Sequence, residues 1–98
     1  MADRGDSNVV PLETGVMFET KRMEGRSGTA LPKHRASIES ALVVISGECV
    51  LALAGTDRVL KQGDSVIIPA DEWHQITAHP EFKAIHIMPL GIRFEFTT

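Results

Sequence analysis

The sequence contains one cysteine, one tryptophan and no tyrosine, and it lacks a long apolar run. A single cysteine, Cys49, excludes an internal disulfide framework and cannot by itself build a thiolate zinc site. No apolar segment approaches the roughly 20 residues that a membrane-spanning helix needs. The N-terminal residues include two early acids and no apolar stretch of the secretory-signal type. These absences predict a cytoplasmic protein with no membrane partner.

Basic charge is also scarce, because 10 Lys and Arg residues stand against 13 Asp and Glu residues and the formal net charge is −3. The chain has no basic block of the kind that contacts a nucleic-acid backbone, so we expect no nucleic-acid partner. Its 98 residues suffice for one compact domain and leave no room for two. A hydrophobic share of 43% excludes wholesale disorder.

The N-terminal residues 1–13 are polar and show no apolar periodicity. We therefore expect a flexible tail over residues 1–13 and a single domain over residues 14–98. The tail contains Arg4–Gly5–Asp6, which matches a cell-adhesion signal, but so short a match is expected by chance.

From residue 14 onwards, short apolar and β-branched segments alternate with turn signals, and none of them shows a sustained helical period. The predicted strands cover residues 16–23, 41–46, 49–54, 58–62, 65–69, 73–78, 82–88 and 92–97. Short strands separated by turns indicate an all-β sandwich or barrel. Residues 41–46 and 49–54 are apolar on both faces, so both faces need cover. A second copy of the chain would supply the outer cover, and we expect a homodimer.

Two stretches of the chain resemble the paired sequence motifs of the cupin superfamily. The matching positions are Gly28, His34 and Gly47 in the first motif and Gly63, Pro69 and His74 in the second. The resemblance covers residues 14–97 and implies a single-domain jelly-roll β-barrel.

The resemblance also implies a metal site, because metal-binding cupins use two histidines and a glutamate from the first motif and a histidine from the second. This chain keeps His34 and His74 but has Ala36 at the second histidine position and Ser40 at the glutamate position. Two imidazoles leave a divalent ion short of ligands, since catalytic sites usually keep three protein ligands.

Strand geometry indicates a candidate for the third ligand. If residues 79–81 form a three-residue hairpin loop, His74 faces His86 across the two strands, with Cβ atoms about 5 Å apart. The sequence therefore predicts a three-histidine site of His34, His74 and His86 that holds a divalent transition metal: zinc, iron, nickel, copper or manganese. The alternative is that His86 is a core histidine hydrogen-bonded to a neighbour.

Three further residues carry weaker hypotheses. Glu39 lies one position before the glutamate position and is either a carboxylate ligand in a loop or, more commonly for glutamate, a solvated side chain. Trp73 is interpreted as a packed aromatic residue, with a pocket wall or an interface anchor as alternatives. Cys49 is expected to pack as a small hydrophobic residue.

Three functions are compatible with these features, and the fold alone does not choose among them. The first is a metal-binding cupin that binds a small-molecule ligand through an ion held by histidines. The second is a metal-free module that binds a sugar-like or other polar metabolite in the barrel, and the third is a structural dimer that serves another protein. The small side chains of Ala36 and Ser40 enlarge the predicted cavity, which suits an organic ligand. No inward-facing carboxylate is evident, so we leave open whether the protein is an enzyme.

Overall fold

The computed structural model describes residues 7–97, which form eight strands. In chain order they are β1 (Ser7–Thr14), β2 (Phe18–Gly25), β3 (His34–Ala36), β4 (Ser40–Leu53), β5 (Thr56–Lys61), β6 (Ser65–Ile68), β7 (His74–Pro89) and β8 (Phe94–Phe96). Among these residues, no helix has the length and hydrophobicity needed to cross a bilayer. The predicted all-β class is confirmed.

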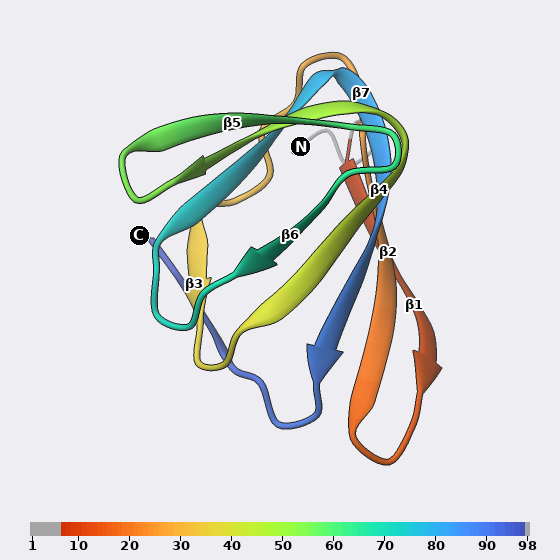
Figure 1. The fold of residues 1–98 in the computed structure, drawn as a ribbon, viewed down its shortest axis with the longest axis vertical. Coiled ribbons are helices and arrows are strands. Elements are labelled where there is room, and N and C mark those ends of the chain that lie inside the picture. Colours follow the sequence, from red (N-terminus) through yellow and green to blue (C-terminus); the bar gives the residue numbers. More distant parts are fainter. Residues whose placement is uncertain (1–6, 98) are drawn as a thin grey trace.

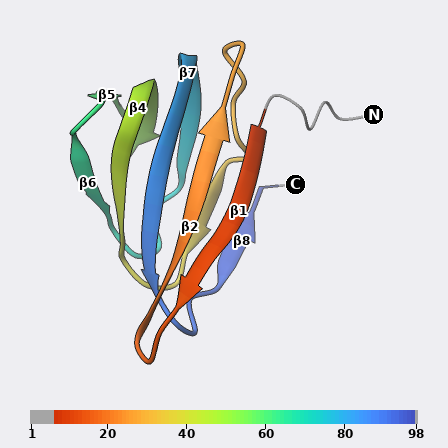
Figure 2. The ribbon, with the colours of Figure 1, turned by 90° about the vertical axis from the view of Figure 1, so that its right-hand side faces the viewer.

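Two long strands, β4 and β7, organise the fold and pair antiparallel over most of their length (Figure 1). The first half of β4 also pairs with β6, and its second half pairs with β5. The second half of β7 pairs with β2, which pairs with β1, while the start of β7 pairs with β3, which pairs with β8. The sheet therefore curls into two walls, β1–β2–β7–β4–β6 and β8–β3–β7–β4–β5, which share their two central strands (Figure 2). This is the predicted jelly-roll barrel.

Strand β4 bends at Gly47, where the pairing with β7 shifts register on both sides. Gly47 has a φ of 73°, in the left-handed region that glycine adopts without steric cost. A Cβ atom at this position would overlap the carbonyl oxygen of Glu81 and would lie 2.9 Å from the Cα of Phe82. Only glycine allows this close approach, and the resulting bulge lets one strand serve both walls.

The hydrophobic core fills the space between the two walls. Buried and exposed side chains alternate along β4 and β7, as expected for strands with one inward face. The largest fully buried side chains are Leu42, Leu51, Leu60, Ile68, Met88, Val44 and Cys49. Burial, with a smaller effect of Glu48, raises the pKa of the free Cys49 thiol to about 11. The expectation that Cys49 packs as a small hydrophobic residue is confirmed.

Two expectations about local structure are wrong. The flexible tail predicted over residues 1–13 is wrong for residues 7–13, because β1 pairs with β2 from Ser7 onwards. Residues 1–6, which include Arg4–Gly5–Asp6, lie outside the described residues. Residues 79–81 are not a hairpin loop, because β7 runs through them without reversing.

Candidate ligand-binding cavity

Three of the four histidines, His34, His74 and His86, lie at inward-facing positions of the barrel, and two of them are in contact. His34 and His74 are register partners at the starts of β3 and β7, and their ring centroids lie 4.4 Å apart with an interplanar angle of 61°. His86 lies further along β7 and is only 7% exposed. The fourth histidine, His79, is exposed and forms an ion-pair contact of 3.2 Å with Glu48.

Backbone carbonyl groups orient two of these imidazoles. The Nδ1 atom of His34 lies 3.0 Å from the oxygen of Pro32, and the Nδ1 atom of His74 lies 3.0 Å from the oxygen of Glu72. A carbonyl oxygen only accepts, so Nδ1 carries the hydrogen in each neutral ring and Nε2 keeps its lone pair. Neither Nε2 atom has a hydrogen-bond partner within residues 7–97, and no fully buried side-chain polar atom there lacks one. Both Nε2 atoms therefore keep a lone pair without a partner among the described residues, although His74 is only 2% exposed.

His86 has a different environment. Its Nε2 atom lies 2.7 Å from Ser40 Oγ, and both residues are buried, which matches the alternative of a hydrogen-bonded core histidine. Burial, followed by the nearby His34, His74 and Lys21, lowers the pKa of His86 to about 4. Burial, with a smaller effect of His34, also lowers the pKa of His74. Both rings are consequently neutral at pH 7, which is the form that binds a metal ion or accepts a hydrogen bond.

A cavity of about 270 Å³ adjoins His34 and His86, and His74 is not among its lining residues. Its polar lining consists of Lys21, His34 and His86, and the described lining includes no acidic side chain. The apolar lining consists of Val9, Met23, Leu31, Pro32, Met88, Phe94 and Phe96. The ring of His34 lies 5.4 Å from that of Phe94 and 5.2 Å from that of Phe96, so aromatic side chains flank it. A mainly apolar cavity with a few polar groups is typical of small-molecule sites.

Sequence reasoning missed Lys21 as a lining residue. The signal was available, because Met23 is a buried residue of the same strand and side chains two positions apart share a face. Lysine side chains are rarely buried, so the inward position of Lys21 was not expected from its residue type.

The donor set is smaller than that of a complete protein-ligated metal centre. Among residues 7–97, no three or more His, Cys, Asp or Glu side chains are grouped in a way that could hold a metal ion. Glu39 is exposed and does not line the cavity, so the carboxylate-ligand hypothesis gains no support. The orientation of His34 and His74 nevertheless fits metal binding, because metal-binding imidazoles usually donate their other nitrogen to a carbonyl or carboxylate. The residues therefore fit an ion with few protein ligands and open coordination positions.

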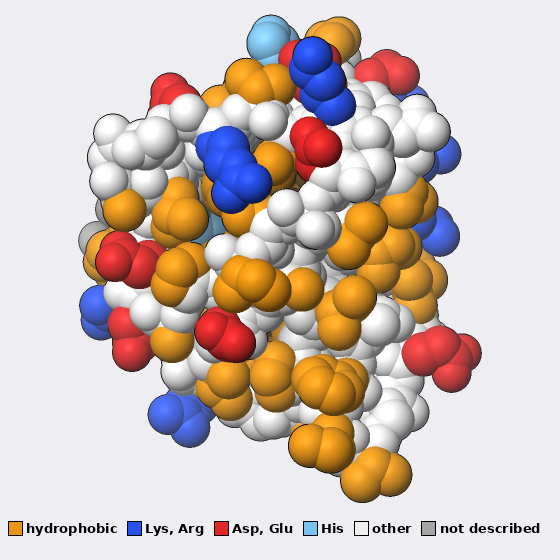
Figure 3. All heavy atoms as spheres, in the orientation of Figure 1, with side chains coloured by type: hydrophobic (Ala, Val, Ile, Leu, Met, Phe, Trp, Pro, Cys, Tyr) orange, Lys and Arg blue, Asp and Glu red, His pale blue; other side chains and the backbone are white. Residues whose placement is uncertain are grey.

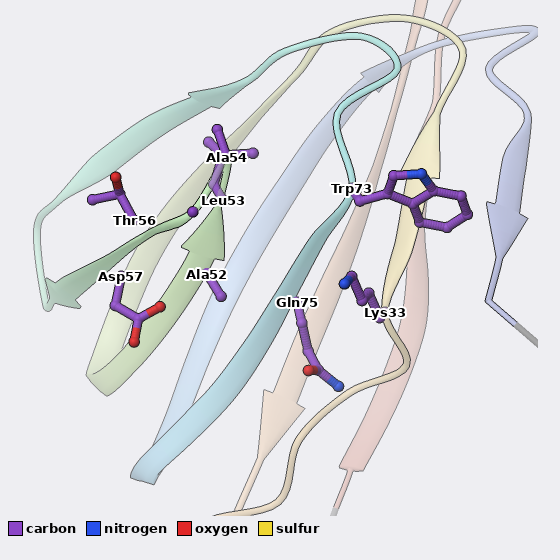
Figure 4. Close-up of a pocket in the computed structure, with 9 residues that line it drawn as sticks. Lys33, Ala52, Leu53, Ala54, Thr56, Asp57, Trp73 and Gln75 are labelled. Carbon is purple, nitrogen blue, oxygen red and sulfur yellow. The ribbon is translucent and has the colours of Figure 1, made fainter.

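Trp73 does not line the barrel cavity. It borders a separate hollow of about 220 Å³ between the β4–β5 turn and the segment that leads into β3 (Figure 4). The guanidinium carbon of Arg35 lies 4.9 Å from the centroid of the indole ring, which is a cation–π contact. The indole ring of Trp73 therefore packs against Arg35 and does not line the barrel cavity, and its role as an interface anchor stays a prediction.

Together, the curled all-β barrel and its histidine-lined apolar cavity define a small-molecule-binding type of barrel. A model of the cupin domain matches residues 21–88 of the chain. The protein belongs to the cupin family.

Solved structures agree with this assignment at the level of the fold. A cupin superfamily protein from Desulfitobacterium hafniense DCB-2 is 17% identical with a TM-score of 0.80, over 91% of this chain and 82% of the other. A conserved protein of unknown function from Streptococcus pyogenes is 14% identical with a TM-score of 0.76, over 89% of this chain and 76% of the other.

A third similar structure is an enzyme, salicylate 1,2-dioxygenase from Pseudoaminobacter salicylatoxidans, as adducts with gentisate. It is 12% identical with a TM-score of 0.84, and the match covers 93% of this chain but only 29% of the dioxygenase chain. Identities this low show a shared fold and nothing further. No match was found among curated proteins.

Proposed function

We propose that this cupin binds a small organic molecule in the barrel cavity together with a divalent transition metal held by His34 and His74, with His86 as a third imidazole. The observation that supports the metal is the pair of backbone hydrogen bonds that fix the tautomers of His34 and His74. Each ring is held so that its Nε2 lone pair is free. The mainly apolar cavity supports the organic ligand.

Each residue has a distinct role in this proposal. His34 and His74 would bind the ion through Nε2, and His86 would join them only by giving up its hydrogen bond to Ser40. A bound ion would supply a Lewis acid with coordination positions open to the ligand. Phe94 and Phe96 would contact the ligand beside His34 and exclude water from that side.

The metal proposal can be tested with protein purified without an affinity tag. We expect Co²⁺ titration to give the visible absorption of a histidine-bound ion, and H34A or H74A to weaken binding by on the order of tenfold or more. H79A is the matched control, because His79 is exposed and its one side-chain ion pair among the described residues is with Glu48. Equal Co²⁺ affinity in wild type, H34A and H74A would contradict the proposal. Wild-type affinity in H86A would remove His86 alone from the ligand set.

Metal-free binding of the organic ligand is the second candidate, and the Ser40–His86 hydrogen bond favours it. That bond occupies the Nε2 atom of His86, so only the Nε2 atoms of His34 and His74 are free to bind a metal ion. Ligand affinity that is the same before and after chelator treatment would favour this candidate over the metal-dependent one.

We also propose that two copies associate through the outer face of the β6–β4–β7 part of the sheet. Figure 3 shows hydrophobic side chains gathered over the lower part of this face. Ile45 and Ile67 are 43% and 56% exposed, and the cross-strand row Ile67–Ala41–Ile87 contains no charge. A twofold interface brings the same patch together from both copies, so an uncharged patch meets itself without repulsion.

We also propose a cytoplasmic location, with which the single free cysteine is compatible.

Light scattering on the purified protein tests the association. We expect twice the chain mass of 10.7 kDa for wild type and a shift towards the monomer for I67K. V59K is the control, because Val59 is 48% exposed but lies on β5 in the other wall. A wild-type monomer at micromolar concentration, or equal effects of the two substitutions, would contradict this interface.

A further inference from the structure

We propose that the ligand of the barrel cavity is a small organic acid with an apolar body, and that Lys21 binds its carboxylate. This inference rests on the proposed function, because it takes the same cavity as the binding site.

Lys21 is a cation without a counterion inside the described structure. Neither an ion pair nor a hydrogen bond of its side chain occurs within residues 7–97. In contrast, Arg22 contacts Glu24 at 2.7 Å and Arg35 contacts Glu95 at 2.8 Å. Lys21 is half-buried, and it lines the cavity. Arg22 and Arg35 therefore have carboxylate partners, whereas the cavity-lining Lys21 has none among residues 7–97.

The electrostatics of the cavity favour a negative ligand group. Lys21 supplies the only permanent charge among the described lining residues of the cavity, and no acidic side chain lines it. His86 is neutral at pH 7, because burial and, to a smaller extent, His34, His74 and Lys21 lower its pKa. Glu19 lies two positions before Lys21 on β2, but it neither lines the cavity nor pairs with Lys21. A partly desolvated ammonium without a partner is unfavourable, and a bound anion would remove that penalty.

The apolar residues that line the cavity favour a ligand with an apolar body. Seven of its ten lining residues are apolar, and two of these are phenylalanines next to His34. A single cation matches a singly charged carboxylate better than a phosphate ester, which would need more donors than this lining offers. The volume of about 270 Å³ accommodates a molecule of one or two rings.

Three probes of nearly equal size separate charge from shape: benzoate, neutral benzamide and cationic benzylammonium. Binding would be followed in chelator-treated protein labelled with ¹³C at the methionine methyl groups. Met23 and Met88 line the cavity, whereas Met17 is 69% exposed elsewhere and serves as an internal control. We expect benzoate to shift the Met23 and Met88 signals at lower concentration than benzamide, with benzylammonium weakest.

Substitution of the lysine then tests the assignment. K21M should weaken benzoate binding on the order of tenfold or more while leaving benzamide binding unchanged, and K21R should retain the preference for benzoate. K83M is the control, because Lys83 is exposed on β7 and lies outside the cavity. Equal affinities for benzoate and benzamide, no Met23 or Met88 shift with millimolar benzoate, or a K21M variant that binds benzoate like wild type would overturn the inference. Loss of Co²⁺ binding in H34A tests the metal separately, so either result can fail while the other stands.

Discussion

Replacing His86 with glutamine should remove about 3 kcal/mol of pH dependence from the stability of the metal-free protein. The pKa of this buried histidine falls from 6.5 to about 4, and each unit corresponds to about 1.36 kcal/mol. Glutamine can still form a hydrogen bond with Ser40 but does not titrate. The comparison of wild type with H86Q therefore separates the effect of protonating His86 from the effect of its packing.

The sign of the effect follows from which state binds the proton first. The unfolded chain takes up a proton at His86 near pH 6.5, whereas the folded chain does so only near pH 4. Within this window the unfolded state holds more protons, so wild-type stability falls as the pH is lowered from about 7 to 4. His74 contributes in the same direction, because its pKa is also lowered, and this part remains in the variant.

Urea unfolding at several pH values between 7.5 and 4 provides the measurement. The free energies of unfolding of wild type and H86Q should converge or cross as the pH falls, with a total change in their difference of about 3 kcal/mol. H79Q removes an exposed histidine and serves as the control. Parallel curves for wild type and H86Q would refute the burial argument for His86.

Two further substitutions test the fold by the same unfolding measurement. G47A should lower the free energy of unfolding by about 2 kcal/mol or more, because a left-handed residue costs about 1–2 kcal/mol and the new Cβ would also meet the backbone of β7. G55A, with a φ of 78° but no atom within 4 Å of the new Cβ, should cost only about 1 kcal/mol, and equal losses would contradict the close-approach argument. S40A should cost about 1–3 kcal/mol because it leaves buried Nε2 of His86 without its partner, whereas S65A at an exposed site should change stability by less than about 0.5 kcal/mol.

The class of fold could be predicted from the sequence, but the continuity of its longest strands could not. Residues 41–46 and 49–54 were predicted as two strands, yet both belong to β4. A glycine with positive φ marks a hairpin turn and a bulge alike, so the local signal at Gly47 does not distinguish them. Long-range pairing with β7 decides between the two. Strand β1 was missed for another reason, since an exposed edge strand needs few apolar residues.

The inward placement of His86 was predicted from an incorrect hairpin. Residues 74 and 86 are separated by an even number of positions, so alternation places both on the same face whether the chain reverses or continues. Their actual neighbours differ from the predicted ones, because His74 pairs with His34 while His86 pairs with Lys21 and Leu42. The backbone hydrogen bonds that fix the tautomers of His34 and His74 have no sequence signal, since any residue supplies a carbonyl.

Strands β4 and β7 each have one half in one wall of the barrel and the other half in the second wall. The two walls therefore cannot fold or unfold independently of each other. Severing either strand at its midpoint would dismantle both halves of the molecule at once. A small chain thereby gains a single cooperative unit, and slow amide exchange should disappear from both walls in the same transition.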